Sequence, residues 1–179
     1  MVLTTPRRHP RVRVVALEGR SGSGKSTVAA RVHRVLATRA APVHLLSMED
    51  LYPGWEGLAA SAGLLHDWVL TPLAHGGRPA WRRYDWARER FAPAWTHLPS
   101  ELGSGGTLLV EGCGSGAASP LLDLLVWVHA PEPVRKRRLD LREDAELYAP
   151  HRRSWALQET EFYATHRPQD RSDLLIANP

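Results

Sequence analysis

Short apolar runs alternate with amphipathic segments along most of the chain. The runs are rich in Val, Leu and Ile and are bounded by Gly, Pro or acidic residues, which is typical of buried strands. Between the first two runs, apolar residues from 28 to 36 recur at the spacing of one helix face. Further helices are expected over 131–147, where arginines are frequent, and over 151–166. The predicted strands cover residues 12–17, 43–50, 107–112, 124–130 and 173–178.

Strands that alternate with helices predict a parallel sheet covered on both faces, because parallel neighbours need a crossover connection. We therefore expect a three-layer α/β domain with a mostly parallel five-stranded sheet. The 179 residues suit one domain, which we place at 12–179 after a loose tail at 1–11. Residues 51–105 show no long periodicity, and short helical pieces interrupted by Gly, Pro and Trp are expected there.

A glycine-rich segment lies between the first strand and the first helix. Residues 19–27 read GRSGSGKST and match G-x-x-x-x-G-K-[ST], the phosphate-binding loop of P-loop NTPase-type domains. Its glycines let backbone N–H groups converge on an anion, and a helix beginning near Lys25 directs its positive end at the phosphates. Lys25 can reach the β- and γ-phosphates, and Ser26 can hold Mg²⁺. The residues expected to bind nucleotide are Gly19, Ser21, Gly22, Ser23, Gly24, Lys25, Ser26 and Thr27.

Composition narrows the classes of partner. The net charge is +4 and the pI about 9.7, but the chain has only two lysines and its arginines are spread out, so no nucleic acid is expected. No apolar run has the length of a membrane span, and the basic N-terminal residues precede no apolar signal-peptide core. A single cysteine, Cys113, agrees with a reducing, cytoplasmic location. Nothing in the sequence determines the oligomeric state.

From Val12 onward, the order of motifs resembles the uridine kinase and phosphoribulokinase branch of P-loop kinases, which includes nicotinamide riboside kinase-like enzymes. In that family an acid after the second strand, in a D-x-F-Y-like segment, is the catalytic base. The matching segment here is 49–52, which reads EDLY. Glu49 occupies the position of the base, as Glu rather than Asp, and Asp50 is its neighbour. The resemblance leaves open which of the two acids is the base.

Three further motifs match the same family. A Y-D-[FW] segment that contacts the acceptor is matched by 84–86, and an E-G pair that ends the third strand is matched by 111–112. An Arg-rich lid helix after the fourth strand is matched within 131–150 by Arg135, Arg137, Arg138 and Arg142. The resemblance implies transfer of the γ-phosphoryl group of ATP to a hydroxyl of a small molecule.

Phosphoryl transfer needs in-line positioning, charge neutralisation and an acid that orients or deprotonates the acceptor. Lys25, Glu49, Asp50, Arg138 and Arg142 are the catalytic candidates, and on a continuous helix the two arginines would share one face. Glu111 ends an apolar strand, where a charge is costly unless it is paired or near a metal. With Ser26 it is expected to lie near Mg²⁺; a structural salt bridge is the alternative.

The acceptor region is expected within 51–105, opposite the phosphate-binding loop. Its candidate residues are Tyr52, Trp55, Tyr84, Asp85 and Trp86. Aromatic rings there could form a flat wall, and the Asp85 carboxylate could accept hydrogen bonds from acceptor hydroxyls. Alternatively, Asp85 pairs with a neighbouring arginine and only holds its loop.

Two other functions remain open at this point. A nucleoside monophosphate kinase would need a second basic cluster for the acceptor phosphate, which could come from Arg78, Arg82, Arg83, Arg88 and Arg90. A nucleotide-binding switch or accessory ATPase acting on a protein is the other. The sequence does not name the acceptor, separate a metabolic kinase from an antibiotic-modifying or biosynthetic phosphotransferase, or distinguish ATP from GTP.

Overall fold

The computed structural model describes residues 2, 9, 12–39, 41–117 and 119–179. The loose tail expected at 1–11 therefore lies mainly outside the described residues. His9 is described, and it is buried, with its ring nitrogen Nε2 2.6 Å from the carbonyl oxygen of Leu121. At this point the chain packs against the rest of the protein.

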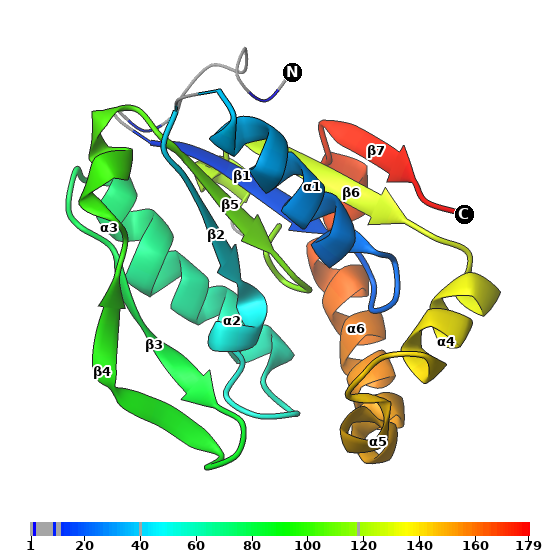
Figure 1. The fold of residues 1–179 in the computed structure, drawn as a ribbon. Helices are drawn as coiled ribbons and strands as arrows, with labels where there is room; N and C mark the ends of the chain where they lie inside the picture. Colours follow the sequence, from blue (N-terminus) through cyan, green and yellow to red (C-terminus); the bar gives the residue numbers. More distant parts are fainter. Residues whose placement is uncertain (1, 3–8, 10–11, 40, 118) are drawn as a thin grey trace.

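In the described part of the chain, five strands form a central sheet in the order β2-β5-β1-β6-β7 (Figure 1). Every neighbouring pair is parallel, so the predicted fold class is confirmed. The second strand ends earlier than predicted and continues as a 3₁₀ turn at Met48–Asp50, which places both acids of the EDLY segment in that turn. The strands are β1 (Arg13–Glu18), β2 (Val43–Ser47), β5 (Thr107–Glu111), β6 (Leu124–His129) and β7 (Leu174–Ala177).

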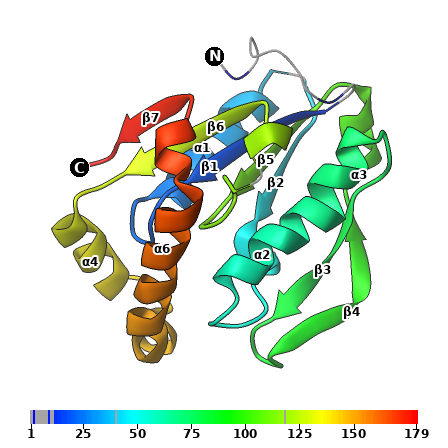
Figure 2. The same ribbon diagram turned by 180° about the vertical axis from the view of Figure 1, so that it is seen from behind.

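Helices cover both faces of this sheet, as Figures 1 and 2 show from opposite sides. Successive side chains of a strand point to opposite faces. Val15 and Leu17 of β1 consequently pack with Ala29 of α1, whereas Val14 and Ala16 pack in the cluster that includes α2 and α6. The helices are α1 (Lys25–Ala37), α2 (Leu58–Leu65), α3 (Thr71–Ala74), α4 (Glu132–Asp140), α5 (Ala145–Tyr148) and α6 (Arg152–His166).

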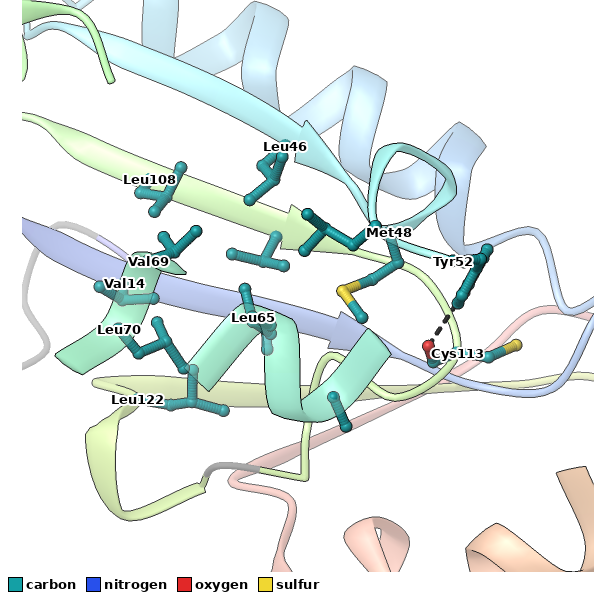
Figure 3. Packing of buried hydrophobic residues seen from close by; sticks show 14 of the residues in the cluster. Val14, Leu46, Met48, Tyr52, Leu65, Val69, Leu70, Leu108, Cys113 and Leu122 are labelled. Atoms are coloured by element: carbon teal, nitrogen blue, oxygen red, sulfur yellow. Dashed lines mark hydrogen bonds between the residues drawn. The ribbon is translucent and has the colours of Figure 1, made fainter. Parts of the chain in front are cut away.

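The larger core lies between the sheet and the segment that runs from α2 to α3. A π-helical turn at His66–Leu70 joins these two helices. In Figure 3, Leu46 and Leu108 of the sheet lie opposite Leu65 and Leu70 of this segment. Burial of these large side chains is the main favourable contribution to such packing, at about 25 cal/mol per Å² of apolar surface. None of the helices in the described ranges combines the length and apolar character of a membrane span.

The region 51–105 also contains an antiparallel hairpin that the sequence did not predict. Its strands are β3 (Ala80–Asp85) and β4 (Arg90–His97), which pair only with each other within the described chain (Figure 1). Arginines and Pro93 interrupt the alternation of apolar and polar residues by which these strands could be predicted. Proline is tolerated here because β4 is an edge strand. Trp81, which is fully buried, attaches the hairpin to the core.

The prediction of one continuous helix over 131–147 is wrong. The chain forms α4 and α5 instead, with a loop at 141–144 between them. Leu139 is the buried residue of α4, so the helix has no apolar stripe that would favour its continuation. Arg142 lies in the loop, and the helix face predicted to carry both Arg138 and Arg142 does not form. The helix predicted at 151–166 is confirmed as α6.

Candidate functional site

The glycine-rich loop has the backbone that its sequence requires. Gly22 and Gly24 have φ values of 78° and 86°, in the left-handed region that favours glycine. A Cβ atom at Gly22 would stand 2.5 Å from the carbonyl oxygen of Arg135, and one at Gly24 would stand 2.3 Å from Nδ2 of Asn178. Because α1 begins at Lys25, its positive dipole end is directed at the loop.

A buried carboxylate from α6 holds this loop from behind. Glu159 accepts hydrogen bonds from the backbone N–H of Ser21 at 2.8 Å and from the indole N–H of Trp155 at 3.2 Å. The same indole also lies 3.1 Å from Oγ of Ser21. Hydrogen bonds to an ionised carboxylate are about twice as strong as neutral ones. The backbone N–H of Ser21 is therefore committed to Glu159, while Ser21 itself still lines the cavity described below.

A second buried carboxylate, Glu18, ends β1 immediately before the loop. It accepts hydrogen bonds from the N–H groups of Gly19, Gly114 and Gly116 at 3.1, 3.1 and 2.8 Å, and from the hydroxyl of Tyr163 at 2.8 Å. Burial raises the pKa of Glu18 to about 7, although these donors and Lys25 oppose the rise. Glu18 thus ties the phosphate-binding loop to the loop after β5 and to α6.

Neither buried acid was predicted to be functional from the sequence. Glu18 terminates an otherwise apolar strand, and Glu159 lies on the same helix face as Trp155, one turn away. An unpaired charge in such a position would be costly. An acid within an apolar pattern is therefore the signal that could have identified both.

A cavity of about 740 Å³ opens beside the phosphate-binding loop at the carboxyl ends of β1, β2 and β5. This is where ligands bind in sheets of this kind. The predicted residues that line it are Ser21, Gly22, Gly24, Lys25, Ser26, Thr27, Glu49, Tyr52, Trp55, Trp86, Glu111, Arg138 and Arg142. The predicted residues that do not line it are Gly19, Ser23, Asp50, Tyr84 and Asp85.

Glu111 lies at the floor of this cavity between two hydroxyl groups. Ser26 donates to its Oε2 at 2.9 Å and Ser47 donates to its Oε1 at 2.9 Å. Ser47 and Glu111 are register partners in β2 and β5, so their side chains leave the sheet on the same face. Hydroxyl and carboxylate oxygens are ligands that Mg²⁺ accepts. Among the described residues there is no group of three or more His, Cys, Asp or Glu that could hold a metal ion.

Lys25 carries a positive charge into the cavity. Burial acts to lower its pKa, but the neighbouring Cys113, Glu111, Glu159 and Glu18 outweigh this effect and raise it. Burial raises the pKa of the Cys113 thiol to about 12, so the thiol is neutral near pH 7 and the carboxylates account for the rise. Lys25 therefore stays protonated at any physiological pH.

The two adjacent acids after β2 point in different directions. Glu49 lines the cavity and has a side chain that is 65% exposed, with Oε1 3.8 Å from an Arg142 nitrogen. The cavity walls limit its hydration and raise its pKa, while Arg142 lowers it in part. Asp50 instead accepts hydrogen bonds from the Trp81 indole at 3.2 Å and from Arg83 at 3.0 Å. Asp50 is thus engaged with the hairpin.

The arginines after β6 contact the cavity and its loop in different ways. Arg135 donates to the carbonyl oxygen of Ser21 at 3.1 Å. Arg138 donates to the carbonyl oxygen of Asn178 at 3.2 Å and lies 3.4 Å from that of Ser23. Arg142 lines the cavity on the side of Glu49. Arg138 and Arg142 therefore flank the cavity, although they do not share a helix face.

Aromatic side chains form one wall of the cavity. Trp55 lies 4.8 Å from Trp86 between ring centroids and stacks on His151 at 4.5 Å with nearly parallel planes. The hydroxyl of Tyr52 donates to the carbonyl oxygen of Cys113 at 2.9 Å (Figure 3). Tyr148, which was not predicted, also lines this wall. Three of the five predicted acceptor residues, Tyr52, Trp55 and Trp86, are therefore brought together at the cavity.

Tyr84 and Asp85 lie in the hairpin, outside the cavity lining. Asp85 accepts hydrogen bonds from the backbone N–H groups of Ala87 and Arg88, and its Oδ2 pairs with the Arg88 guanidinium at 2.7 Å. These bonds lower the pKa of Asp85. The geometry favours the alternative in which this carboxylate holds its own turn.

Solved structures of low sequence identity share this fold. A Silicibacter sp. TM1040 protein, provisionally assigned as a fructose transport system kinase, has a TM-score of 0.60 at 19% identity, with 96% of this chain and 92% of that chain covered. A Bacillus stearothermophilus protein, provisionally assigned as a uridine kinase, has a TM-score of 0.59 at 18% identity, covering 92% and 88%. By sequence, no family model and no curated protein matches the chain. The predicted resemblance is thus supported at the level of the fold, which this chain shares with these two kinase-assigned structures.

Proposed function

We propose that this chain is an ATP- and Mg²⁺-dependent phosphotransferase that moves the γ-phosphoryl group to a hydroxyl of a small molecule. One observation carries the proposal. A single cavity of about 740 Å³ contains Lys25, the hydrogen-bonded pair Ser26 and Glu111, the carboxylate of Glu49, and an aromatic wall. Phosphate binding, charge neutralisation and acceptor activation can therefore act on one bound pair of substrates.

Each residue has a separate task in this reaction. The loop N–H groups and Lys25 hold the phosphates, and Arg138 and Arg142 stabilise negative charge as it shifts during transfer. Glu49 accepts the proton of the acceptor hydroxyl as its oxygen bonds to the γ-phosphorus. The bond between that phosphorus and the bridging β–γ oxygen breaks, and ADP leaves.

Ser26 and Glu111 are the residues that would hold the metal ion. The Ser26 hydroxyl would be a ligand, and the Glu111 carboxylate, which accepts its hydrogen bond, would add negative charge beside the ion. When bound, Mg²⁺ supplies charge neutralisation at the β- and γ-phosphates. Ser47 keeps the second oxygen of Glu111 occupied and so orients the carboxylate toward Ser26.

The positions of the hairpin arginines favour a neutral alcohol over a nucleoside monophosphate as acceptor. A monophosphate acceptor would need basic side chains in the aromatic half of the cavity. Arg82 donates to the carbonyl oxygen of Ala92, Arg83 pairs with Asp50, and Arg88 pairs with Asp85. Arg78 lines a separate cavity, and Arg90 does not line the cavity that contains Lys25. The acid Glu49 and the aromatic residues instead suit a hydroxyl carried by a nucleoside-like or other small metabolite.

The test is transfer of the γ-phosphoryl group from radiolabelled ATP across matched panels of nucleosides, nucleoside monophosphates and other hydroxylated metabolites. We expect labelled product with one or more neutral alcohols, dependent on added Mg²⁺. Product with monophosphates alone would establish the rival acceptor class. ATP hydrolysis without transfer to any acceptor, stimulated by a protein fraction, would favour an accessory ATPase. A parallel series with GTP determines the nucleotide preference.

A further inference from the structure

The loop between α4 and α5 contains a closely fitted ion pair. Arg142 donates from Nε to Oδ1 of Asp144 and from a terminal nitrogen to Oδ2, both at 2.7 Å. Two parallel bonds of this kind fix the plane of the guanidinium as well as its position. The guanidinium also lies over the Tyr148 ring, 5.4 Å from its centroid. Carboxylate and ring together restrict a side chain that would otherwise sample many rotamers.

Asp144 does not use its side chain for the role that its position would suggest. It stands at the N-cap of α5, where an Asp carboxylate commonly accepts a hydrogen bond from a backbone N–H of the first helical turn. Within the described chain, no such side-chain cap bond is formed at α5. Both carboxylate oxygens are directed at Arg142 instead. The backbone carbonyl of Asp144 accepts from the N–H of Tyr148 at 2.9 Å, so the turn itself does not depend on the carboxylate.

The two hydrogen bonds to Asp144 determine which part of the Arg142 guanidinium faces the cavity. The terminal nitrogen that bonds Asp144 also lies 3.8 Å from Oε1 of Glu49. Asp144 occupies Nε and one terminal nitrogen of Arg142, and no hydrogen bond from the other terminal nitrogen is found within the described residues. Both Arg142 and Asp144 line the cavity. The pair therefore presents a guanidinium of fixed orientation next to the carboxylate that would accept the acceptor proton.

We propose that Asp144 is a positioning residue, which holds Arg142 in the orientation that places its remaining N–H groups at the site of phosphoryl transfer beside Glu49. This inference rests on the proposed function for the identity of the reaction. The contribution is to the transition state, because a guanidinium already oriented before charge develops need not reorganise during transfer. Both oxygens of Asp144 bond Arg142, so the proposed effect of Asp144 passes through that side chain.

The experiment compares Asp144→Asn with a matched control on the same segment. Asp140→Asn also removes one carboxylate, but Asp140 pairs with Arg152 of α6 and does not line the cavity. We expect Asp144→Asn to lower kcat by about tenfold or more, with the KM for ATP little changed, as for an interaction used in the transition state. Asp140→Asn should leave kcat near that of the unchanged protein.

A double-mutant cycle with Arg142→Ala tests whether Asp144 acts through Arg142. If it does, Asp144→Asn combined with Arg142→Ala should be no slower than Arg142→Ala alone. Additive losses would overturn the proposal, as would an unchanged kcat in Asp144→Asn. A raised KM for ATP accompanied by lower thermal stability would also overturn it, since that pattern belongs to a merely structural loop contact.

A spectroscopic measurement separates this inference from the proposed function. The Nε–H proton of Arg142 should give a resolved, slowly exchanging NMR signal that is lost in Asp144→Asn and kept in Asp140→Asn. If the unchanged protein transfers phosphate to no acceptor, the proposed reaction fails. The signal then still decides whether Asp144 holds Arg142. Loss of this signal in both variants, or in neither, would overturn the positioning role.

Discussion

The two halves of the cavity are constructed differently. On the phosphate side, the loop is fixed from behind by side chains that are almost fully buried, above all Glu18 and Glu159. On the acceptor side, Glu49 is exposed, and Trp55 and Trp86 are half-buried where they pack against the edge of the core. The first half combines the backbone of a glycine-rich loop with the side chains of Lys25 and Ser26, whereas the second offers chiefly aromatic side chains and Glu49.

The difference predicts how each half responds to substitution. The conformation of the glycine-rich loop depends on the buried side chains that pack behind it. Substituting those side chains therefore changes the folding stability and the pH dependence of that stability. A wall of side chains at the surface of a cavity can change with little effect on the folded state. Variants on the phosphate side should therefore separate into catalytic and structural classes, and variants on the acceptor side should mainly alter turnover or specificity.

The largest effect is expected at the cavity face of the phosphate side. Lys25→Ala should lower transfer by about three orders of magnitude or more, because the charge that holds the transferring phosphates is lost. Lys136→Ala is the matched control, since it removes the other lysine, which pairs with Glu132 on the surface. Steady-state turnover and circular dichroism measure the two effects. Near-normal turnover of Lys25→Ala in a folded protein would disprove the kinase function.

On the acceptor side, Glu49→Gln should reduce kcat by roughly two orders of magnitude with little change in nucleotide affinity, as expected when a general base is removed. Asp50→Asn is the comparison, because that acid bonds Trp81 and Arg83 instead of lining the cavity. It should have the smaller kinetic effect. The opposite ranking of the two kcat values would assign the base to Asp50.

Behind the loop, Glu18→Gln should change the pH dependence of stability. The pKa of Glu18 is raised to about 7 in the folded protein from an ordinary value of 4.5. The folded state therefore retains a proton that the unfolded chain releases, and this contribution is complete below pH 4.5 and lost as the pH rises through 7. The shift corresponds to about 3 kcal/mol.

Urea unfolding at pH 5 and pH 8 measures this contribution. The unchanged protein should lose more unfolding free energy across that interval than Glu18→Gln, which has no titrating group at this position. Comparing the two proteins removes the contribution of other groups that titrate in the same range. Identical pH dependence in both proteins would show that Glu18 is ionised throughout, with its four hydrogen-bond donors outweighing burial.

The smallest effect is expected in the hairpin turn. Asp85→Asn should slightly lower the melting temperature, because the pairing with Arg88 and part of the turn hydrogen bonding are lost. The KM values for ATP and acceptor should both stay unchanged, since Asp85 does not line the cavity. A selective rise in the KM for the acceptor would show that Asp85 contacts the acceptor after all.

Much of the architecture could be predicted from the sequence because its determinants are local. Five apolar runs at the right separation predict the sheet, and nine consecutive residues from Gly19 carry the phosphate-binding loop. The hairpin β3–β4 escaped prediction because arginines and Pro93 obscure the alternation of its strands. Residues 131–147 were predicted as one helix, and their arginines, lysine and glutamates do favour helix, but propensity without an apolar stripe does not sustain one.

The chemistry proposed for the phosphate side could be predicted from the sequence, since it belongs to neighbouring residues of one segment. The partners of the acids could not, because they come from distant segments. Glu159 meets Ser21 across 138 positions of sequence, and Tyr163 meets Glu18 across 145. The two adjacent acids, Glu49 and Asp50, are separated by a turn that sends one to the cavity and the other to the hairpin. Such contacts depend on how distant segments pack, and a local pattern of residue types does not specify which distant segments come together.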